Sequence, residues 1–229
     1  MKEKITIYTA ASLFNARETY FNSRLVEGLE KLDYKTNFPQ RDGFEFENLQ
    51  KALTGKVSQV EINSAVQKII YFLDLGQFIP KSDVILANFD EPIDEGVIVE
   101  TSYARLMGKY VIGFRTDLRS PYGVSKENFG GMHTFPAYQA DKFISYHMSA
   151  RDPYEREHQM NSLVQIIHKA IEKEDFSDRK IPRYARRNPN ISSIIDGARI
   201  LFKGIQDIHS EKGLEEIAQR YTKHRSELI

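Results

Sequence analysis

Five side chains could take part in acid–base or nucleophilic chemistry because of where they lie relative to predicted strands and helices. Asp90 and Asp94 follow a short apolar run, and Glu100 follows them within a predicted helix. Asp74 lies near the end of an earlier amphipathic helix, and Tyr8 lies near the end of the first predicted strand. Neighbouring carboxylates raise one another's pKa values, so that one can act as a nucleophile while another keeps a proton. Glycoside chemistry uses carboxylates in this way.

Two other interpretations of these acids stay open at this point. A carboxylate near a helix start, such as Glu100, complements the positive end of the helix dipole and can serve as a cap. Clustered acids can also bind Mg²⁺, which prefers oxygen ligands. Residue types and spacing alone indicate a crevice lined with acids.

Several common site motifs are absent from the sequence. Residues 8–15 contain no glycine, which excludes a G-x-G-x-x-G dinucleotide fingerprint after the first strand, and there is no P-loop, H-E-x-x-H or G-x-S-x-G motif. The six histidines are scattered, and the absence of cysteine excludes thiolate metal sites and a cysteine nucleophile. Apart from Mg²⁺ at the clustered acids, which stays open at this point, we expect neither a metal ion nor a cofactor.

Composition indicates an ordinary globular protein. Lys+Arg and Asp+Glu both number 32, so no overall electric field favours nucleic acid or a membrane surface. Hydrophobic residues make up 41% of the chain, which excludes a disordered protein. No apolar run approaches the ~20 residues of a membrane span, and the N-terminus does not resemble a signal peptide. We expect a cytoplasmic protein that binds neither nucleic acid nor a membrane.

The elements predicted to position the acids alternate between strand and helix. Residues 82–115 predict a βαβ unit, with strands at 84–87 and 111–114 and a helix at 97–107. Its strands must be parallel, and ligands of such sheets bind outside the carboxyl ends of the strands. Further strands are predicted at about 4–10, 34–38 and 141–147, and helices at about 16–32, 59–78, 153–174, 191–208 and 213–227. The sequence therefore predicts an α/β protein with a parallel sheet of about five strands flanked by helices.

The chain is expected to divide near residue 174. Residues 1–174 form the predicted α/β domain, and residues 175–229 form a charged linker followed by a C-terminal helical extension. The apolar stripes of the two last helices require a partner surface, on the main domain or on another subunit. Residues 122–138, rich in glycine and aromatic residues, predict a functional loop or lid.

Four segments resemble the nucleoside 2-deoxyribosyltransferase family. They are IYTAASLFN at residues 7–15, FPQRDG at 38–43, SDVILA at 82–87 and DEGVIVE at 94–100. The likeness covers about residues 4–120, and the spacing from Asp94 to Glu100 is its most specific part. The resemblance implies a flavodoxin-like or Rossmann-like fold, exchange of the base on a 2′-deoxynucleoside, and a nucleoside and a free nucleobase as small-molecule partners.

The resemblance also implies a role for each candidate residue. Glu100 would attack the anomeric carbon, and Tyr8 would hydrogen-bond to this carboxylate and orient it. Asp74 would exchange a proton with the base, and Asp94 would bind a sugar hydroxyl. The other implied substrate contacts are Phe14, then Gln40, Arg41 and Asp42 around the base, and Asn161 from a neighbouring subunit. That last contact would make the protein a homo-oligomer, at least a dimer.

The sequence departs from the family pattern at four positions. Ala11-Ser12 stands where the family usually has Gly-Pro, Ser102 replaces a glycine, and Val97 replaces a frequent threonine. Because Ser12 and Ser102 are expected near the sugar, the choice between deoxyribose and ribose stays open.

Two other functions are compatible with the sequence. One is an N-glycoside hydrolase acting on nucleosides or nucleoside 5′-monophosphates through the same glutamate, with a phosphate near one of Arg17, Arg41, Arg115 or Arg119. The other is a nucleotide-sensing module without catalytic activity, whose C-terminal helices signal to a partner.

Overall fold

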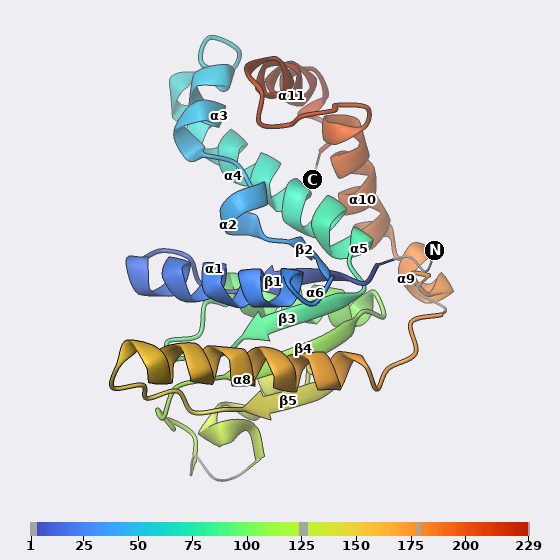
Figure 1. The fold of residues 1–229 in the computed structure, drawn as a ribbon. Coiled ribbons are helices and arrows are strands. Elements are labelled where there is room, and N and C mark those ends of the chain that lie inside the picture. The colour runs from blue at the N-terminus through green and yellow to red at the C-terminus, as the bar shows by residue number, and fades with distance from the viewer. Residues whose placement is uncertain (1–3, 124–127, 178–179, 229) are drawn as a thin grey trace. The chain divides into compact units, whose positions relative to one another are not determined.

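The computed structural model describes residues 4–123, 128–177 and 180–228 (Figure 1). Five strands form one sheet in the order β2-β1-β3-β4-β5, and every neighbouring pair is parallel. This is the flavodoxin-like order, whose switch point lies between β1 and β3. The predicted fold class is confirmed, and each strand lies within its predicted region or within one residue of it. The strands are β1 Thr6–Ala10, β2 Lys35–Asn37, β3 Val84–Asn88, β4 Tyr110–Arg115 and β5 Lys142–Ser145.

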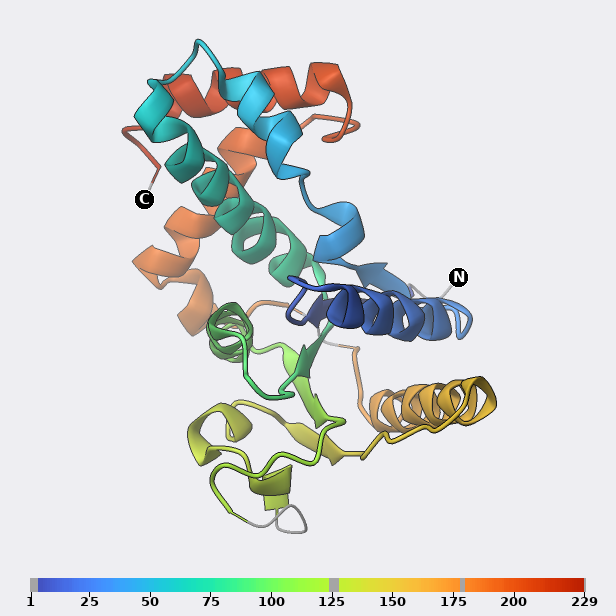
Figure 2. The same ribbon diagram turned by 90° about the vertical axis from the view of Figure 1, so that its left-hand side faces the viewer.

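Helices cover both faces of the sheet (Figure 2). The helices α1 (Ala16–Glu30) and α8 (Pro153–Ile171) pack on one face, where Ile7 belongs to a continuous buried cluster with residues of both helices. Helix α6 (Glu95–Leu106) contacts β1, β3 and β4 from the opposite face. Because successive side chains of a strand point to opposite faces, Ile7 faces α1 and α8, and Tyr8 faces α6.

Short helices follow β2 and β4. After β2 lie α2 (Pro39–Asp42) and α3 (Phe46–Leu53). In the predicted lid, η3 (Asn128–Gly131) and α7 (Thr134–Ala137) are helical, whereas residues 124–127 lie outside the described residues. The lid function therefore stays a prediction.

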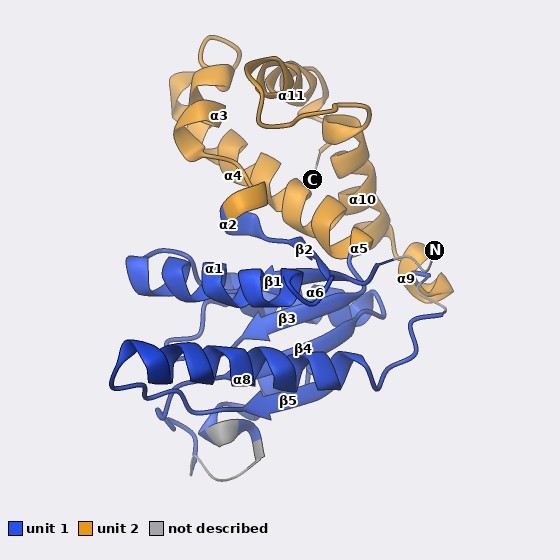
Figure 3. Cartoon of the chain, viewed as in Figure 1, with its two compact units in different colours: residues 1–40, 82–181 blue, residues 41–81, 182–229 orange. Residues whose placement is uncertain are grey.

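Contacts divide the chain into two compact units, residues 1–40 with 82–181 and residues 41–81 with 182–229 (Figure 3). Two segments lie in a different unit from the one that the predicted division near residue 174 gives them: residues 41–81, expected with the sheet, and residues 175–181, expected with the C-terminal extension. Residues 41–81 pack with the C-terminal helices, because α3 and α4 (Ile62–Leu73) supply the apolar surfaces that those helices cover.

The second unit consists of helices. The chain enters it through α3, η1 (Gln59–Glu61), α4 (Ile62–Leu73), the π-helical turn η2 (Asp74–Phe78) and α5 (Ile79–Lys81), and returns through α9 (Arg183–Arg186), α10 (Pro189–Phe202) and α11 (Glu211–His224). Helix α10 packs on α4 and η2, and α11 packs on α3. A continuous helix was predicted over 59–78; the structure widens it into a π-turn that begins at Asp74.

Two glycines allow α10 to approach this π-turn closely. A Cβ atom on Gly197 would lie 2.3 Å from Cε1 of Phe72, and one on Gly76 would lie 2.5 Å from Cβ of Ala198. Any larger residue at either position would push the helices apart. The C-terminal helices therefore support the turn that carries Asp74.

In the ranges that the structure describes, no helix is both long enough and apolar enough to cross a membrane.

Gly197→Ala is expected to destabilise the second unit. Overpacking against Phe72 lowers the free energy of unfolding by about 1–3 kcal/mol. The higher helix propensity of alanine raises it by about 1 kcal/mol at most. Denaturant unfolding should show a lower midpoint, and Phe72→Leu in the same chain should recover part of the loss by removing ring atoms. Asp196→Ala, an exposed change at the neighbouring position, is the control. Equal midpoints for Gly197→Ala and the control would contradict the close approach.

Candidate active site

The central contact joins β1 to α6. The Tyr8 hydroxyl donates a hydrogen bond of 2.9 Å to Oε1 of Glu100. Tyr8 has no exposed surface, and Glu100 is half-buried. A charge-assisted hydrogen bond from a buried phenol fixes the orientation of the carboxylate. The two residues that the resemblance pairs thus lie in contact.

Helix α6 begins two residues earlier than predicted, and Asp94 is the reason. The Asp94 side chain accepts a hydrogen bond of 3.1 Å from the backbone N–H of Val97, so Asp94 is the N-cap residue. Glu100 consequently lies in the second turn of the helix. The alternative in which Glu100 caps the helix is wrong, since Asp94 performs that role.

A crevice of about 350 Å³ opens at the carboxyl ends of β1 and β3. Asp94 lies in its wall, and the position is the switch point of the sheet, where ligands of this fold class bind. The lining comes from the segments after β1, β3 and β4: Ser12, Asn15, Arg17, Glu18, Phe21, Asn88, Asp90, Glu91, Pro92, Asp94 and Arg119.

Hydrogen bonds fix the loops after β3 and β4 to each other. Asp90 accepts bonds from the backbone N–H and the hydroxyl of Thr116, both 2.6 Å, and from the backbone N–H of Asp117 at 3.0 Å. Asp117 accepts from the buried guanidinium of Arg115 at 2.5 Å and from the backbone N–H of Glu91 at 2.7 Å. Asp90 is therefore a structural residue. This network was not predicted from the sequence.

The wall of the crevice contains more acidic than basic residues. It contains two arginines, Arg17 and Arg119, against four acids. Burial raises the pKa of Glu18, but hydrogen bonds from the Ser12 hydroxyl and the Phe14 backbone N–H outweigh this effect and leave its pKa below the ordinary value. Ser12, one of the departures from the family pattern, thus orients an ionised carboxylate at the crevice.

Asp74, in the second unit, has the surroundings of a proton-transfer group. Desolvation raises the pKa of Asp74 to about 7. Its carboxylate has no hydrogen-bond or ion-pair partner in the described part of the chain, so nothing offsets the cost of burying the charge. The π-turn that presents it is a feature that occurs frequently at functional sites.

The remaining predicted residues have varied surroundings. Gln40 donates from Nε2 to the carbonyl of Thr19, and its buried Oε1 has no hydrogen-bond partner among the residues described. Arg41 and Asp42, in the second unit, pair with each other through two bonds of 2.8 and 3.0 Å. Phe14 is 79% exposed, and Asn161 is exposed on α8.

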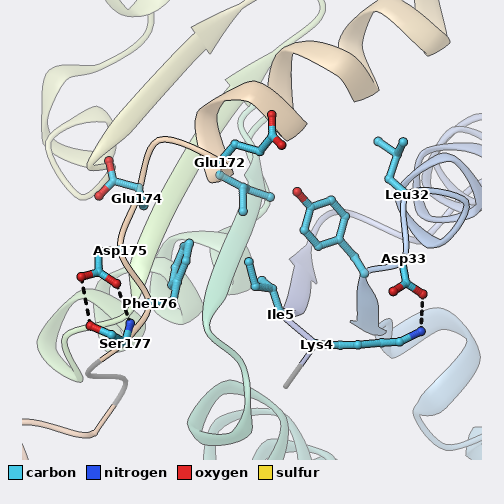
Figure 4. A pocket seen from close by; sticks show the side chains of 11 residues that line it. Lys4, Ile5, Leu32, Asp33, Glu172, Glu174, Asp175, Phe176 and Ser177 are labelled. Atoms are coloured by element: carbon cyan, nitrogen blue, oxygen red, sulfur yellow. Dashed lines mark hydrogen bonds and ion pairs between the residues drawn. The ribbon is translucent and has the colours of Figure 1, made fainter. Parts of the chain in front are cut away.

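A larger cavity lies at the opposite, amino-terminal edge of the sheet (Figure 4). It measures about 790 Å³, and Phe176 and Ile5 lie in its wall, where Lys4 pairs with Asp33. It contains none of the candidate residues. Because parallel sheets bind ligands at the carboxyl ends of their strands, the smaller crevice is the better candidate despite its volume.

No group of three or more His, Asp or Glu side chains in the described ranges is arranged to hold a metal ion.

The sequence model described as "Nucleoside 2-deoxyribosyltransferase" matches residues 7–134, more than half of the 229 residues. The chain belongs to this family. The matched segment includes every strand of the sheet except β5, together with Tyr8, Asp94 and Glu100. The family is named for enzymes that transfer the deoxyribosyl group of a nucleoside.

Solved structures with similar folds have low identity to this chain. A conserved protein from Enterococcus faecalis V583 is 18% identical, with 73% of this chain and 99% of that chain covered and a TM-score of 0.49. A CMP N-glycosidase from Clostridium botulinum is 16% identical, with 72% and 98% covered and a TM-score of 0.40. A 2-deoxyribosyltransferase from Bacillus psychrosaccharolyticus is 15% identical, with 77% and 96% covered and a TM-score of 0.42. These similarities are too low to transfer a residue role. No curated protein sequence matches the chain.

Asp74→Asn is expected to stabilise the protein at high pH. The pKa of Asp74 is about 7 in the folded chain and 3.8 without burial, so the folded state binds the proton more tightly. The free energy of unfolding of the wild type should therefore fall by on the order of a few kcal/mol as the pH rises from about 4 to 7. The asparagine variant should lack this fall, be more stable than wild type at pH 8, and match it near pH 4. Denaturant unfolding at several pH values measures this, with the exposed Asp196→Asn as control; parallel wild-type and Asp74→Asn profiles would refute the buried charge.

Proposed function

We propose that this protein is a nucleoside 2-deoxyribosyltransferase that exchanges the base of a 2′-deoxynucleoside by double displacement through Glu100. The observation that carries the proposal is the 2.9 Å hydrogen bond from the buried Tyr8 hydroxyl to Glu100, at the switch point of the sheet. A nucleophilic carboxylate must be held in one orientation, and this bond holds it. Such exchange would serve nucleoside salvage.

The first step forms a covalent intermediate. A Glu100 oxygen attacks C1′ of the sugar, the bond from C1′ to the base nitrogen breaks, and the base leaves with its electron pair. Asp74 gives the leaving nitrogen a proton. The product is an ester between Glu100 and deoxyribose.

The second step reverses the first with a different base. Asp74 removes a proton from the entering base, whose nitrogen attacks C1′ and releases the Glu100 carboxylate. Two inversions retain the configuration at C1′. Proton transfer of this kind contributes about 10²–10⁴-fold and works best when the pKa of the group is near the working pH, which supports Asp74 because its pKa is about 7.

Further side chains are proposed to hold the substrate. Gln40 has a buried acceptor oxygen without a partner in the described ranges, which a base N–H group would satisfy. Asp94 uses one oxygen for the helix cap, and its other oxygen would accept a bond from a sugar hydroxyl. The remaining proposed contacts are Phe14, Arg41 and Asp42, and Asn161 from a second copy, in a homo-oligomer without a cofactor.

A second candidate is hydrolysis of a nucleoside 5′-monophosphate. Arg17 favours it, since this guanidinium lines the crevice and has no partner among the described side chains. The four acids in the same wall oppose it, because they would repel a phosphate dianion. The charge balance therefore favours the neutral nucleoside.

Glu100→Gln and Glu100→Ala are expected to reduce turnover by several orders of magnitude, because each removes the nucleophile. Circular dichroism should show a retained fold. In the wild type, incubation with a 2′-deoxynucleoside should add the mass of one deoxyribosyl unit to the peptide that contains Glu100, as measured by mass spectrometry of digested protein. A sensing module would give no adduct, and its nucleoside affinity would survive Glu100→Ala. Glu95→Gln, an exposed change on the same helix, is the control.

Transfer and hydrolysis are separated by supplying an acceptor base. With 2′-deoxyinosine and adenine, the proposed enzyme should form 2′-deoxyadenosine, and without adenine it should release free deoxyribose much more slowly. Chromatography of both reactions measures this. A release rate that does not depend on adenine would identify a hydrolase, and a parallel reaction with cytidine 5′-monophosphate tests the phosphorylated substrate.

A further inference from the structure

Among the four acids of the crevice, only Glu91 has a carboxylate without a partner in the part of the chain that the structure describes. It lines the same wall as Asp94, but its carboxylate makes no hydrogen bond or ion pair with any described residue. One of its oxygens, Oε1, is buried. The other acids differ: Asp90 accepts three hydrogen bonds from Thr116 and Asp117, and Glu18 accepts bonds from Ser12 and Phe14.

The position of Glu91 is fixed by its backbone. Its N–H donates a bond of 2.7 Å to Oδ2 of Asp117. Asp117 is held in turn by the guanidinium of Arg115, which is 1% exposed and also donates to the carbonyl of Arg119 at 2.6 Å. A side chain on such a cross-linked loop is presented at a defined place, so Glu91 is preorganised for an interaction that the chain itself does not supply.

The chemistry of a carboxylate limits what the missing partner can be. An ionised carboxylate only accepts hydrogen bonds, so the ligand must offer a donor. A buried acceptor without a partner is costly, and a donor that reaches it is bound strongly. A phosphate group has no suitable donor and carries the same sign of charge. The hydroxyl groups of a sugar meet the requirement, and Asp94 in the same wall is proposed to bind one of them.

We propose that Glu91 accepts a hydrogen bond from a second sugar hydroxyl of the substrate and thereby helps to select the sugar. This inference rests on the proposed function only in taking a nucleoside as the ligand. Rotation about the terminal bond of the glutamate side chain has broad minima, so the carboxylate can turn its unpaired oxygen toward the crevice. Glu91 is then a specificity residue, distinct from the nucleophile and from the proton-transfer group.

The test measures binding in a chain that cannot react. In a Glu100→Gln background, Glu91→Ala should weaken 2′-deoxyinosine binding by about tenfold to hundredfold, the range for a hydrogen bond to a charged group. Glu95→Ala in the same background removes an equal charge from an exposed position outside the crevice and should change affinity by less than about twofold. Isothermal titration calorimetry gives each dissociation constant, and thermal unfolding checks each variant.

Analogues then identify the hydroxyl. The series is 2′-deoxyinosine, 2′,3′-dideoxyinosine, 2′,5′-dideoxyinosine and inosine. The loss of affinity caused by Glu91→Ala should disappear with the one analogue that lacks the contacted hydroxyl. If the contact is to the 2′-hydroxyl, this loss should instead be larger with inosine. The inference would be overturned if Glu91→Ala weakened binding equally across the series, if it did not weaken binding, or if no nucleoside bound at all. If Glu91→Ala does not fold, Glu91→Gln keeps the side-chain volume and should show the same pattern at reduced size.

The outcome is separable from that of the proposed function. Binding in the Glu100→Gln chain needs no turnover, so the analogue pattern can hold even if the wild type transfers no base. Conversely, base transfer by the wild type with equal affinities for Glu91→Ala and Glu95→Ala would retain the proposed function and refute the role of Glu91.

Discussion

The hydrogen bond between Tyr8 and Glu100 is the interaction on which the rest of the site depends. It requires β1 and α6 to be neighbours, which the parallel order of the sheet achieves because the crossover from β3 to β4 runs through α6. It also requires Tyr8 to face α6, which follows from the alternation of side chains along β1. Helix α6 must begin where Asp94 caps it, since a later start would rotate Glu100 about the helix axis and away from the phenol.

The two compact units contribute different kinds of chemistry. The sheet unit holds the oriented carboxylate and an acid-lined crevice whose loops are cross-linked by Asp90, Arg115 and Asp117. The helical unit holds Asp74 on a π-turn, where desolvation brings its pKa to about 7. In the proposed reaction the oriented Glu100 would be the nucleophile and Asp74 the group that carries a proton.

The fold was largely predictable from the sequence, and the site was predictable only in part. Apolar runs bounded by polar turns located β1, β3 and β4, because strands buried in a parallel sheet leave a strong pattern. The shorter edge strands β2 and β5 were located as well, although they are less buried. The resemblance identified Tyr8 and Glu100, which the structure joins by a hydrogen bond. The start of α6 was misplaced because Asp94 was not considered as the N-cap residue. The π-turn at Asp74 could not be predicted, since it depends on α10 packing against Gly76 from more than a hundred residues away. The Glu91 carboxylate has no partner among the described residues, and its position depends on hydrogen bonds between loops, which no local sequence pattern encodes.

The helical unit is assembled from two stretches of chain with residues 82–181 between them. During synthesis, α4 therefore leaves the ribosome long before α10 exists, and at usual elongation rates the hundred intervening residues take on the order of 5–20 s. For that interval the apolar surface of α4 that α10 covers in the folded protein stays exposed, although α3 is already available to pack on the helix. A nascent chain with this exposed apolar surface is expected to bind chaperones. A truncated product that ends after the sheet would expose the same surface permanently and would be prone to aggregation.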